Sequence, residues 1–240
     1  MRTTVDFSVD SPYSQSLSRT GYQGFIDNAT YRHQLKFIQS KCCEGVSKIL
    51  DVGCGSGIFL KVASSILKDF KFYGLDYDHR LLEEASIRVK EGIFNQGSAE
   101  VLPFEDDHFD FITSFHNIEH LYNPESFVSD CTRVLKINGY LLLATPNPKS
   151  ISSKYLREKW GASIQNTPDH VSLKSPKEWK DLFETHGFQV ICEGTTLLSS
   201  LPLLSKTPLK YINQFLLYSF GNFSWTGGEA YQAIFKLSRK

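Results

Sequence analysis

The chain has 240 residues, of which 41% are hydrophobic and 22% are charged, proportions typical of a globular protein. Its 26 basic and 26 acidic side chains give a formal net charge of zero, which argues against a protein that binds nucleic acid through a basic surface. The five cysteines include no C-x-x-C pair, so we expect neither a disulfide framework nor a zinc site. We expect a cytoplasmic location for the same reason. No apolar run suggests a signal peptide or a stable membrane span.

Short apolar runs alternate with longer amphipathic segments between residues 48 and 145. Strands are predicted at Lys48–Val52, Lys71–Asp76, Phe109–Phe115 and Tyr140–Thr145. Helices are predicted at Ile58–Leu67, Arg80–Val89 and Pro124–Leu135. A further helix starts after the N-cap Ser175 and ends near Gly187, and two closing strands follow at Phe188–Thr196 and Tyr231–Leu237. This alternation predicts an α/β fold with a mostly parallel sheet and helices on both faces.

A glycine-rich loop, Asp51-Val52-Gly53-Cys54-Gly55-Ser56-Gly57, joins the first predicted strand to the first predicted helix. Glycines at such a turn permit positive φ angles and let a ligand approach the backbone. The N-terminus of the following helix favours an electronegative ligand group. Asp76 ends the next strand about 20 residues after the first glycine, where an acid can accept hydrogen bonds from both hydroxyls of a ribose.

The spacing of the loop distinguishes two cofactors that use this layout. A dinucleotide site requires G-x-G-x-x-G, and the third glycine position of that pattern is Ile58 in this chain. Asp51 places a carboxylate just before the loop, which suits an ammonium group and repels a pyrophosphate. The loop therefore favours S-adenosylmethionine as the cofactor.

Several segments together resemble the motifs of class I S-adenosylmethionine-dependent methyltransferases. They are Ile49–Leu60, Gly74–Asp78, Gly97–Phe104, Phe109–Ile112 and Arg133–Asn147, in the order found in that family. The resemblance covers about residues 45–190 and is strongest to the small-molecule branch that includes ubiquinone-biosynthesis O-methyltransferases. It implies a Rossmann-like, doubly wound sheet of seven strands whose last strand is antiparallel.

The resemblance also implies one methyltransferase domain over residues 1–240. Residues 1–45 would form an N-terminal helical cap and residues 46–145 the cofactor-binding core. Two insertions, at 146–174 and 197–228, would build the site of the methyl acceptor. The apolar part of the second insertion, 197–220, is expected to pack on the core as a helix, with a lid or a peripheral membrane contact as the alternative.

The family's cofactor contacts, carried onto this chain, fall on Asp51, Gly53, Gly55, Gly57, Asp76, Tyr77, Ser98, Ala99, Glu100 and Ser114. Asp51 would help to hold the amino group of the methionine moiety, and Asp76 would bind the ribose. Tyr77 would lie against the adenine. The family often has Asp at the position of Ser98, so a contact from that position to the adenine amino group is weaker here.

Three histidines and one glutamate are expected to meet at the acceptor pocket. His116, Glu119 and His120 follow one predicted strand, and His170 follows another, so all four leave the sheet at its carboxyl edge. One of the histidines, His120, His170 or His116, is expected to act as the general base, for which an imidazole is suited near neutral pH.

Two other interpretations of these histidines remain open at the level of sequence. One is a divalent metal site, and the other is purely structural pairing within the loop. Some RNA 2′-O and ubiquinone-pathway methyltransferases resemble this segment with Glu-x-x-Glu-His, but this chain has His116 at the first position. We therefore expect no metal in the site.

The expected reaction is an in-line methyl transfer to an oxygen of a small-molecule, glycan or lipid-linked acceptor, carried out by a monomer or a homodimer. A non-catalytic module that binds S-adenosylmethionine for regulation is the first alternative. A nucleic-acid methyltransferase is the second, although the Asn/Asp-Pro-Pro-aromatic motif of amino-methylating DNA enzymes is replaced here by Phe115-His116-Asn117-Ile118.

Overall fold

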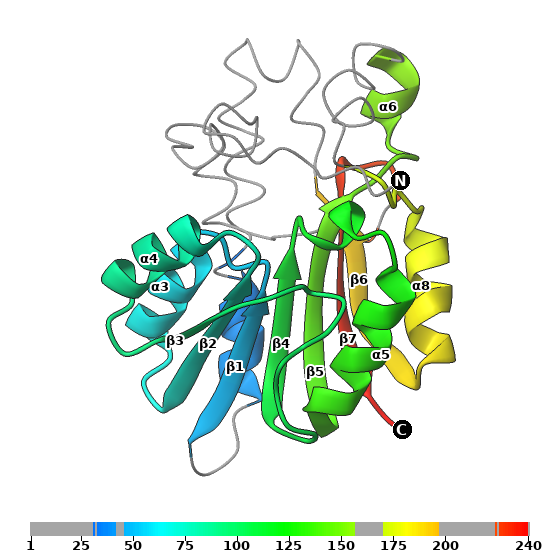
Figure 1. Cartoon of the computed structure of the whole chain (residues 1–240). Helices are drawn as coiled ribbons and strands as arrows, with labels where there is room; N and C mark the ends of the chain where they lie inside the picture. The colour runs from blue at the N-terminus through cyan, green and yellow to red at the C-terminus, as the bar shows by residue number, and fades with distance from the viewer. Residues whose placement is uncertain are drawn as a thin grey trace, which may run out of the picture.

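The computed structural model describes residues 31, 33–41, 46–156, 170–196, 224 and 226–239. A mixed sheet of seven strands forms the centre of this part of the chain, in the order β3-β2-β1-β4-β5-β7-β6 (Figure 1). Neighbouring strands are parallel except at β7, which is antiparallel to both β5 and β6. The predicted seven-stranded, mostly parallel sheet with an antiparallel last strand is confirmed.

The strands are β1 (Ser47–Val52), β2 (Phe70–Asp76), β3 (Ile93–Gln96), β4 (Phe109–Phe115), β5 (Leu135–Pro146), β6 (Phe188–Thr195) and β7 (Ala230–Leu237). The helices are α3 (Ile58–Ile66), α4 (His79–Arg88), α5 (Pro124–Val134), α6 (Ile151–Leu156) and α8 (Pro176–Thr185), with a short 3-10 turn η2 (Ile118–His120). Residues 33–40 of the expected N-terminal cap are also helical. Residues 157–169, 197–223 and 225 of the two expected insertions lie outside the described residues.

Two strands differ from the sequence-based expectation. β3 was not predicted, because it has only four residues, Ile-Phe-Asn-Gln, and none of them is fully buried at this edge of the sheet. β5 begins at Leu135, five residues before the predicted start at Tyr140. The polar residues that follow Leu135 interrupt the apolar pattern of the strand. One of them, Asn138, has a φ of 67°, which is uncommon for a residue other than glycine.

The starts of two helices follow from their capping residues. The side chain of Asn123 accepts a hydrogen bond from the N–H of Ser126 at 3.2 Å, and α5 begins at the next residue, Pro124. Ser175 and Glu178 form a reciprocal capping box at the start of α8. Both starts were predicted, and the structure confirms them.

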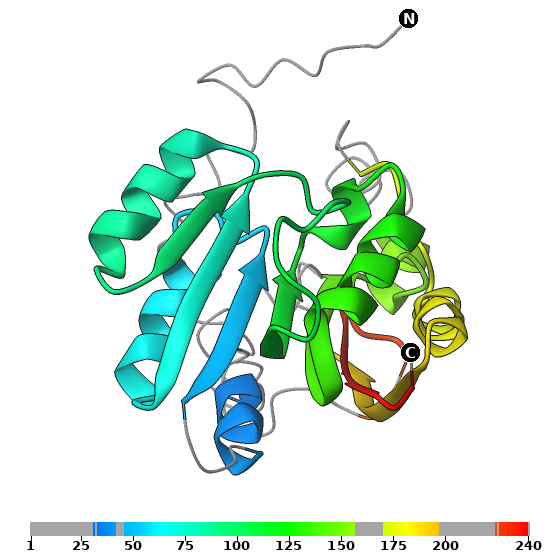
Figure 2. The ribbon, with the colours of Figure 1, turned by 60° about the horizontal axis from the view of Figure 1, so that its bottom comes forward.

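Alternate side chains of the central strands pack on opposite faces of the sheet. Leu50 of β1 and Ile112 of β4 belong to one apolar cluster, which includes side chains of α5 and α8. Ile49 and Phe111, next to them in sequence, belong to a second cluster, which includes side chains of residues 33–40, α3 and α4. Figures 1 and 2 show α5 and α8 side by side. The doubly wound arrangement with helices on both faces is confirmed.

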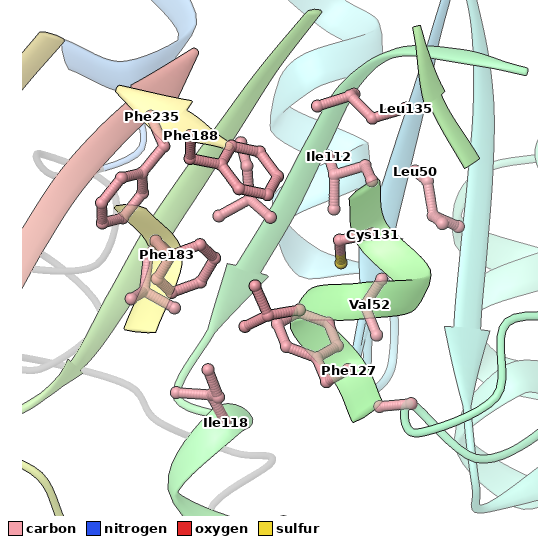
Figure 3. Packing of buried hydrophobic residues seen from close by; sticks show 14 of the residues in the cluster. Leu50, Val52, Ile112, Ile118, Phe127, Cys131, Leu135, Phe183, Phe188 and Phe235 are labelled. Carbon is pink, nitrogen blue, oxygen red and sulfur yellow. The ribbon is translucent and has the colours of Figure 1, made fainter. Parts of the chain in front are cut away.

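Aromatic rings fill much of the cluster under α5 and α8. Figure 3 shows Phe183 of α8, Phe188 of β6 and Phe235 of β7 gathered in one region, with Phe127 of α5 nearby. The rings of Phe183 and Phe235 are stacked with their centroids 4.3 Å apart. None of the helices in the described ranges combines the length and hydropathy that crossing a membrane requires.

Phe127 offers a direct test of this core. Its side chain is 0% exposed, so Phe127→Ala should lower the free energy of unfolding by about 3–5 kcal/mol, as removal of a buried ring does. Ile87→Ala in α4, where the side chain is 77% exposed, should change it by less than about 0.5 kcal/mol. Urea unfolding measures both values, and equal losses in the two variants would contradict this packing.

Candidate active site

The loop between β1 and α3 has a backbone that glycine adopts readily. Gly53, Gly55 and Gly57 have φ angles of 75°, 51° and 75°, in the left-handed region that most other residues avoid. The N–H groups of Gly53 and Cys54 both donate to the carbonyl of Leu75, at 2.8 and 3.0 Å. The loop is thereby attached to the end of β2.

The three glycines have different surroundings. A Cβ at Gly53 would lie 2.6 Å from the side chain of Asn117, and a Cβ at Gly57 would lie 2.9 Å from the Cβ of Ala85 in α4. A Cβ at Gly55 would meet no atom of the described residues within 4 Å. The packing of the protein itself therefore requires Gly53 and Gly57, whereas no described residue packs against Gly55, so a ligand can approach its backbone.

Asp51 places a buried carboxyl group directly before this loop. Its side chain is 3% exposed, and its Oδ1 accepts a hydrogen bond from Oγ1 of Thr113 at 2.7 Å. Burial raises the pKa of Asp51 to about 7; the hydrogen bond from Thr113 opposes this rise, and the nearby charge of Asp76 adds to it. Because a buried charge is costly unless it is paired, this carboxyl group suits a cationic ligand group.

Asp76 lies at the end of β2 and faces the loop. Its Oδ2 accepts from the N–H of Gly55 at 2.8 Å, and its Oδ1 accepts from the N–H of Asp78 at 3.0 Å. Burial raises the pKa of Asp76, and these two hydrogen bonds limit the rise. The backbone N–H of Tyr77 also contributes a hydrogen bond to this carboxylate. A carboxylate offers about four acceptor positions on its two oxygens, so Asp76 can still accept from a ligand hydroxyl.

The segment after β3 lies next to Asp76, because the N–H of Gly97 donates to the carbonyl of Asp76 at 3.0 Å. The hydroxyl of Ser98 accepts from the N–H of Glu100 at 3.1 Å. The carboxylate of Glu100 in turn accepts from the N–H of Asn123 at 2.7 Å. Glu100 thus joins this segment to the residue that caps α5.

The other predicted cofactor residues differ in exposure. Tyr77 is 62% exposed and presents an aromatic ring at the edge of the loop region, whereas Ala99 is 9% exposed. Ser114 is 0% exposed, and its hydroxyl accepts a hydrogen bond from Nδ2 of Asn117 at 3.3 Å. The structure therefore places Ser114 beneath Asn117 at the end of β4.

The histidine segments meet around Glu119, as their positions in the sequence predicted. The N–H of Ser172 donates to the carbonyl of Glu119 at 2.9 Å, which holds the segment containing His170 against η2. One ligand atom each of Glu119, His120 and His170 lie within 4.8 Å of one another. The rings of His120 and His170 have their centroids 4.7 Å apart.

Glu119 is the most buried member of this group. Its side chain is 1% exposed, and its Oε2 accepts a hydrogen bond from Oγ1 of Thr145 at 3.0 Å. Its Oε1 lies 3.5 Å from Nδ1 of His116. Burial acts to raise the pKa of Glu119, but the hydrogen bond from His116 and the charges of His116 and His120 hold it below its ordinary value.

Sequence reasoning missed three polar residues at the ends of strands and beside the loop. They are Thr113 and Thr145, which donate to the two buried acids, and Asn117, which fills the space left by Gly53. Buried polar groups require hydrogen-bond partners. A hydroxyl within an otherwise apolar strand was the signal that could have identified both threonines.

With this geometry described, comparison with known proteins gives the family. A family model described as a methyltransferase domain matches residues 22–193. The chain belongs to this methyltransferase family. The assignment confirms the resemblance that the ordered motifs carry.

Among curated relatives, the chain is 31% identical over 142 residues to a probable S-adenosylmethionine-dependent methyltransferase of Mycolicibacterium smegmatis, covering 59% of this chain and 52% of the relative. It is 32% identical over 156 residues to the ubiquinone biosynthesis O-methyltransferase of Methylococcus capsulatus, covering 60% of this chain and 64% of the relative. The methyltransferase therefore spans roughly half to three fifths of the length of such relatives.

A solved structure shows the same fold at low sequence identity. The complex between the Haloferax volcanii Trm112 methyltransferase activator and a methyltransferase aligns with a TM-score of 0.68 and 18% identity, covering 97% of this chain and 100% of the matched chain. At this identity the likeness concerns the fold alone.

The raised pKa of Asp51 predicts a pH-dependent stability. In the unfolded chain an aspartate has a pKa of about 4, whereas in the folded protein Asp51 has a pKa of about 7. Between these values the folded state holds a proton that the unfolded state has lost, so the contribution of Asp51 to stability falls as pH rises from about 4 to about 7. Asp51→Asn removes this contribution.

Urea unfolding of wild type and Asp51→Asn at pH 5 and pH 8 measures the effect. The stability of the variant relative to wild type should rise by about 2 kcal/mol between these two pH values. Asp110→Asn serves as the control, since Asp110 accepts from the N–H of Lys48 at the opposite end of the same strands. Parallel pH curves for wild type and Asp51→Asn would show that the burial of Asp51 does not raise its pKa.

Proposed function

We propose that this methyltransferase transfers a methyl group from S-adenosylmethionine to a hydroxyl oxygen of a small-molecule, glycan or lipid-linked acceptor. The observation that carries the cofactor assignment is the open backbone at Gly55, which lies between the two acids Asp51 and Asp76. Membership of the methyltransferase family and the similarity to S-adenosylmethionine-dependent relatives support it. Bound S-adenosylmethionine would supply an activated methyl group on a sulfonium.

Each end of the cofactor has a partner of matching chemistry. Asp51 would pair with the α-ammonium group and would be ionised in that pair. Asp76 would accept hydrogen bonds from the ribose hydroxyls. Tyr77, the N–H of Ala99 and the hydroxyl of Ser98 would hold the adenine.

Glu100 and Ser114, both predicted to touch the cofactor, have supporting positions in this proposal. The carboxylate of Glu100 holds the adenine-side segment against Asn123. Ser114 lies under Asn117, which orders the side of the loop nearest to the histidines. Gly53 and Gly57 give the loop its left-handed backbone.

The acceptor oxygen is activated by a histidine of the group around Glu119. A neutral imidazole has one ring nitrogen that accepts a proton, and His120 and His170 present two such rings side by side. In-line attack then depends on holding the hydroxyl close to the sulfonium methyl, which is a matter of positioning. The relatives named for O-methylation support oxygen as the acceptor atom.

The remaining partner assignments rest on composition. Zero net charge favours an acceptor other than nucleic acid. Three cysteines of the described residues, Cys54, Cys131 and Cys192, are free thiols, which favours the cytoplasm. We infer action as a monomer or a homodimer.

The ribose assignment is tested by Asp76→Ala. Loss of the carboxylate removes both hydroxyl acceptors, so the affinity for S-adenosylmethionine should fall at least about tenfold, the effect of losing hydrogen bonds to a charged group. Isothermal titration calorimetry measures the affinity, and a thermal unfolding scan checks that the variant is folded. Asp110→Ala, at the other end of the sheet, should bind as wild type does. Unchanged affinity in a folded Asp76→Ala would remove the assignment.

The general-base assignment is tested by replacing the two paired histidines singly. His120→Gln or His170→Gln should lower turnover by about 100-fold or more where the replaced ring is the base, while cofactor affinity stays within about twofold. Turnover is measured with labelled cofactor against a panel of hydroxylated small molecules, glycans and lipid-linked sugars. His186→Gln at the end of α8 is the control. Full activity in both single variants would contradict a role for these rings.

A further inference from the structure

The buried carboxylate of Glu119 requires a positive partner close by. A carboxylate that is 1% exposed is unfavourable in its ionised form unless a positive charge or several hydrogen bonds compensate it. Within the described ranges, the basic side chain beside Glu119 is that of His116, which is charged only when protonated, and no lysine or arginine pairs with Glu119. Besides the hydrogen bond from Thr145, an imidazolium or a bound cation can compensate this charge.

Three ligand atoms near Glu119 are close enough to share one divalent ion. Each of the two carboxylate oxygens of Glu119, however, already faces a hydrogen-bond donor. Oε2 accepts the hydroxyl hydrogen of Thr145 at 3.0 Å, and Oε1 faces Nδ1 of His116 at 3.5 Å. A protonated His116 would already balance the charge of Glu119 at Oε1, so this arrangement does not require an ion at the carboxylate.

The backbone at His116 supports a dedicated position for this side chain. Its φ is 53°, in the left-handed region that is uncommon for residues other than glycine. Its N–H donates to the carbonyl of Ala144 at 2.8 Å, at the end of β5. Such a conformation persists where the surrounding structure imposes it, and here it keeps the imidazole of His116 beside Glu119.

We propose that His116 is a built-in cation, an imidazolium that holds the charge of Glu119 in place of a divalent ion. His116 is then a positioning residue and not the general base. The N–H of its ring donates to Oε1 of Glu119, and Glu119 remains fixed under η2. With no ion to coordinate at this position, a ring of His120 or His170 can serve as the acceptor of the proton from the acceptor hydroxyl.

This catalytic consequence rests on the proposed function, but the charge assignment does not. It is tested in the free full-length protein, with neither cofactor nor acceptor, by calorimetric titration with Mn²⁺. Wild type, His116→Glu and the remote control His186→Glu are compared. Replacing the cation by a second carboxylate beside Glu119, His120 and His170 creates a favourable ligand set for a divalent ion.

His116→Glu should bind one Mn²⁺ per chain at least about tenfold more tightly than wild type, because affinity rises with the number of charged ligands. His186→Glu should behave as wild type does. The proposal is overturned where wild type binds one Mn²⁺ as tightly as His116→Glu, and also where a folded His116→Glu gains no affinity.

A second measurement applies even where His116→Glu does not fold. His116→Gln, Glu119→Gln and the double variant are unfolded in urea as a double-mutant cycle, which isolates the interaction between the two side chains. His116→Gln should lower the unfolding midpoint in the wild-type background, and by less than half as much once Glu119 is already Gln. Equal shifts in the two backgrounds would show that His116 does not hold the charge of Glu119. Failure of methyl transfer would leave both results unaffected.

Discussion

The hydrogen bond from Thr113 to Asp51, 2.7 Å long, joins β4 to β1 at the point on which the site depends. The strand order β3-β2-β1-β4-β5 reverses direction there, so the chain leaves β1 toward one side and β4 toward the other. Parallel sheets open a crevice at such a point, beyond the carboxyl ends of their strands. The glycine loop follows β1 and the histidine turn follows β4, and the two meet at this edge of the sheet, where Asn117 packs beside Gly53.

The two buried acids at this edge of the sheet, Asp51 and Glu119, differ in the charges and hydrogen-bond donors around them. On the β1 side, burial leaves Asp51 with a raised pKa and no cationic partner among its hydrogen bonds, which suits a ligand that brings its own positive charge. On the β4 side, Glu119 has imidazoles around it, and its pKa is held low. Asn117 lies between them, since it fills the space beside Gly53 and begins the turn that carries Glu119. In the proposed function, binding of the methyl donor and removal of the proton therefore fall to neighbouring but separate groups.

Much of the fold and part of the site could be predicted from the sequence, because local chemistry specified them. The caps at Asn123 and Ser175 indicated two helix starts, and the three glycines after a buried strand indicated a loop with positive φ angles between β1 and α3. The edge strand β3 was not predicted because its four residues, none of them fully buried, are too few to show an alternation of apolar and polar side chains. The donors to Asp51 and Glu119 escaped because Thr113 and Thr145 meet those acids only through sheet register, at sequence separations of 62 and 26 residues. Which of the three histidines serves as the proposed base depends on the charges around each ring in three dimensions, and sequence spacing does not specify these.

The central claim is that the loop between Asp51 and Asp76 binds S-adenosylmethionine and not a dinucleotide. Calorimetric titration of the wild-type chain with S-adenosylmethionine and, separately, with NAD compares the two cofactors that this layout can serve. We expect one S-adenosylmethionine bound per chain and no measurable heat of binding for NAD. Saturable binding of NAD, or no binding of S-adenosylmethionine to the folded chain, would contradict it.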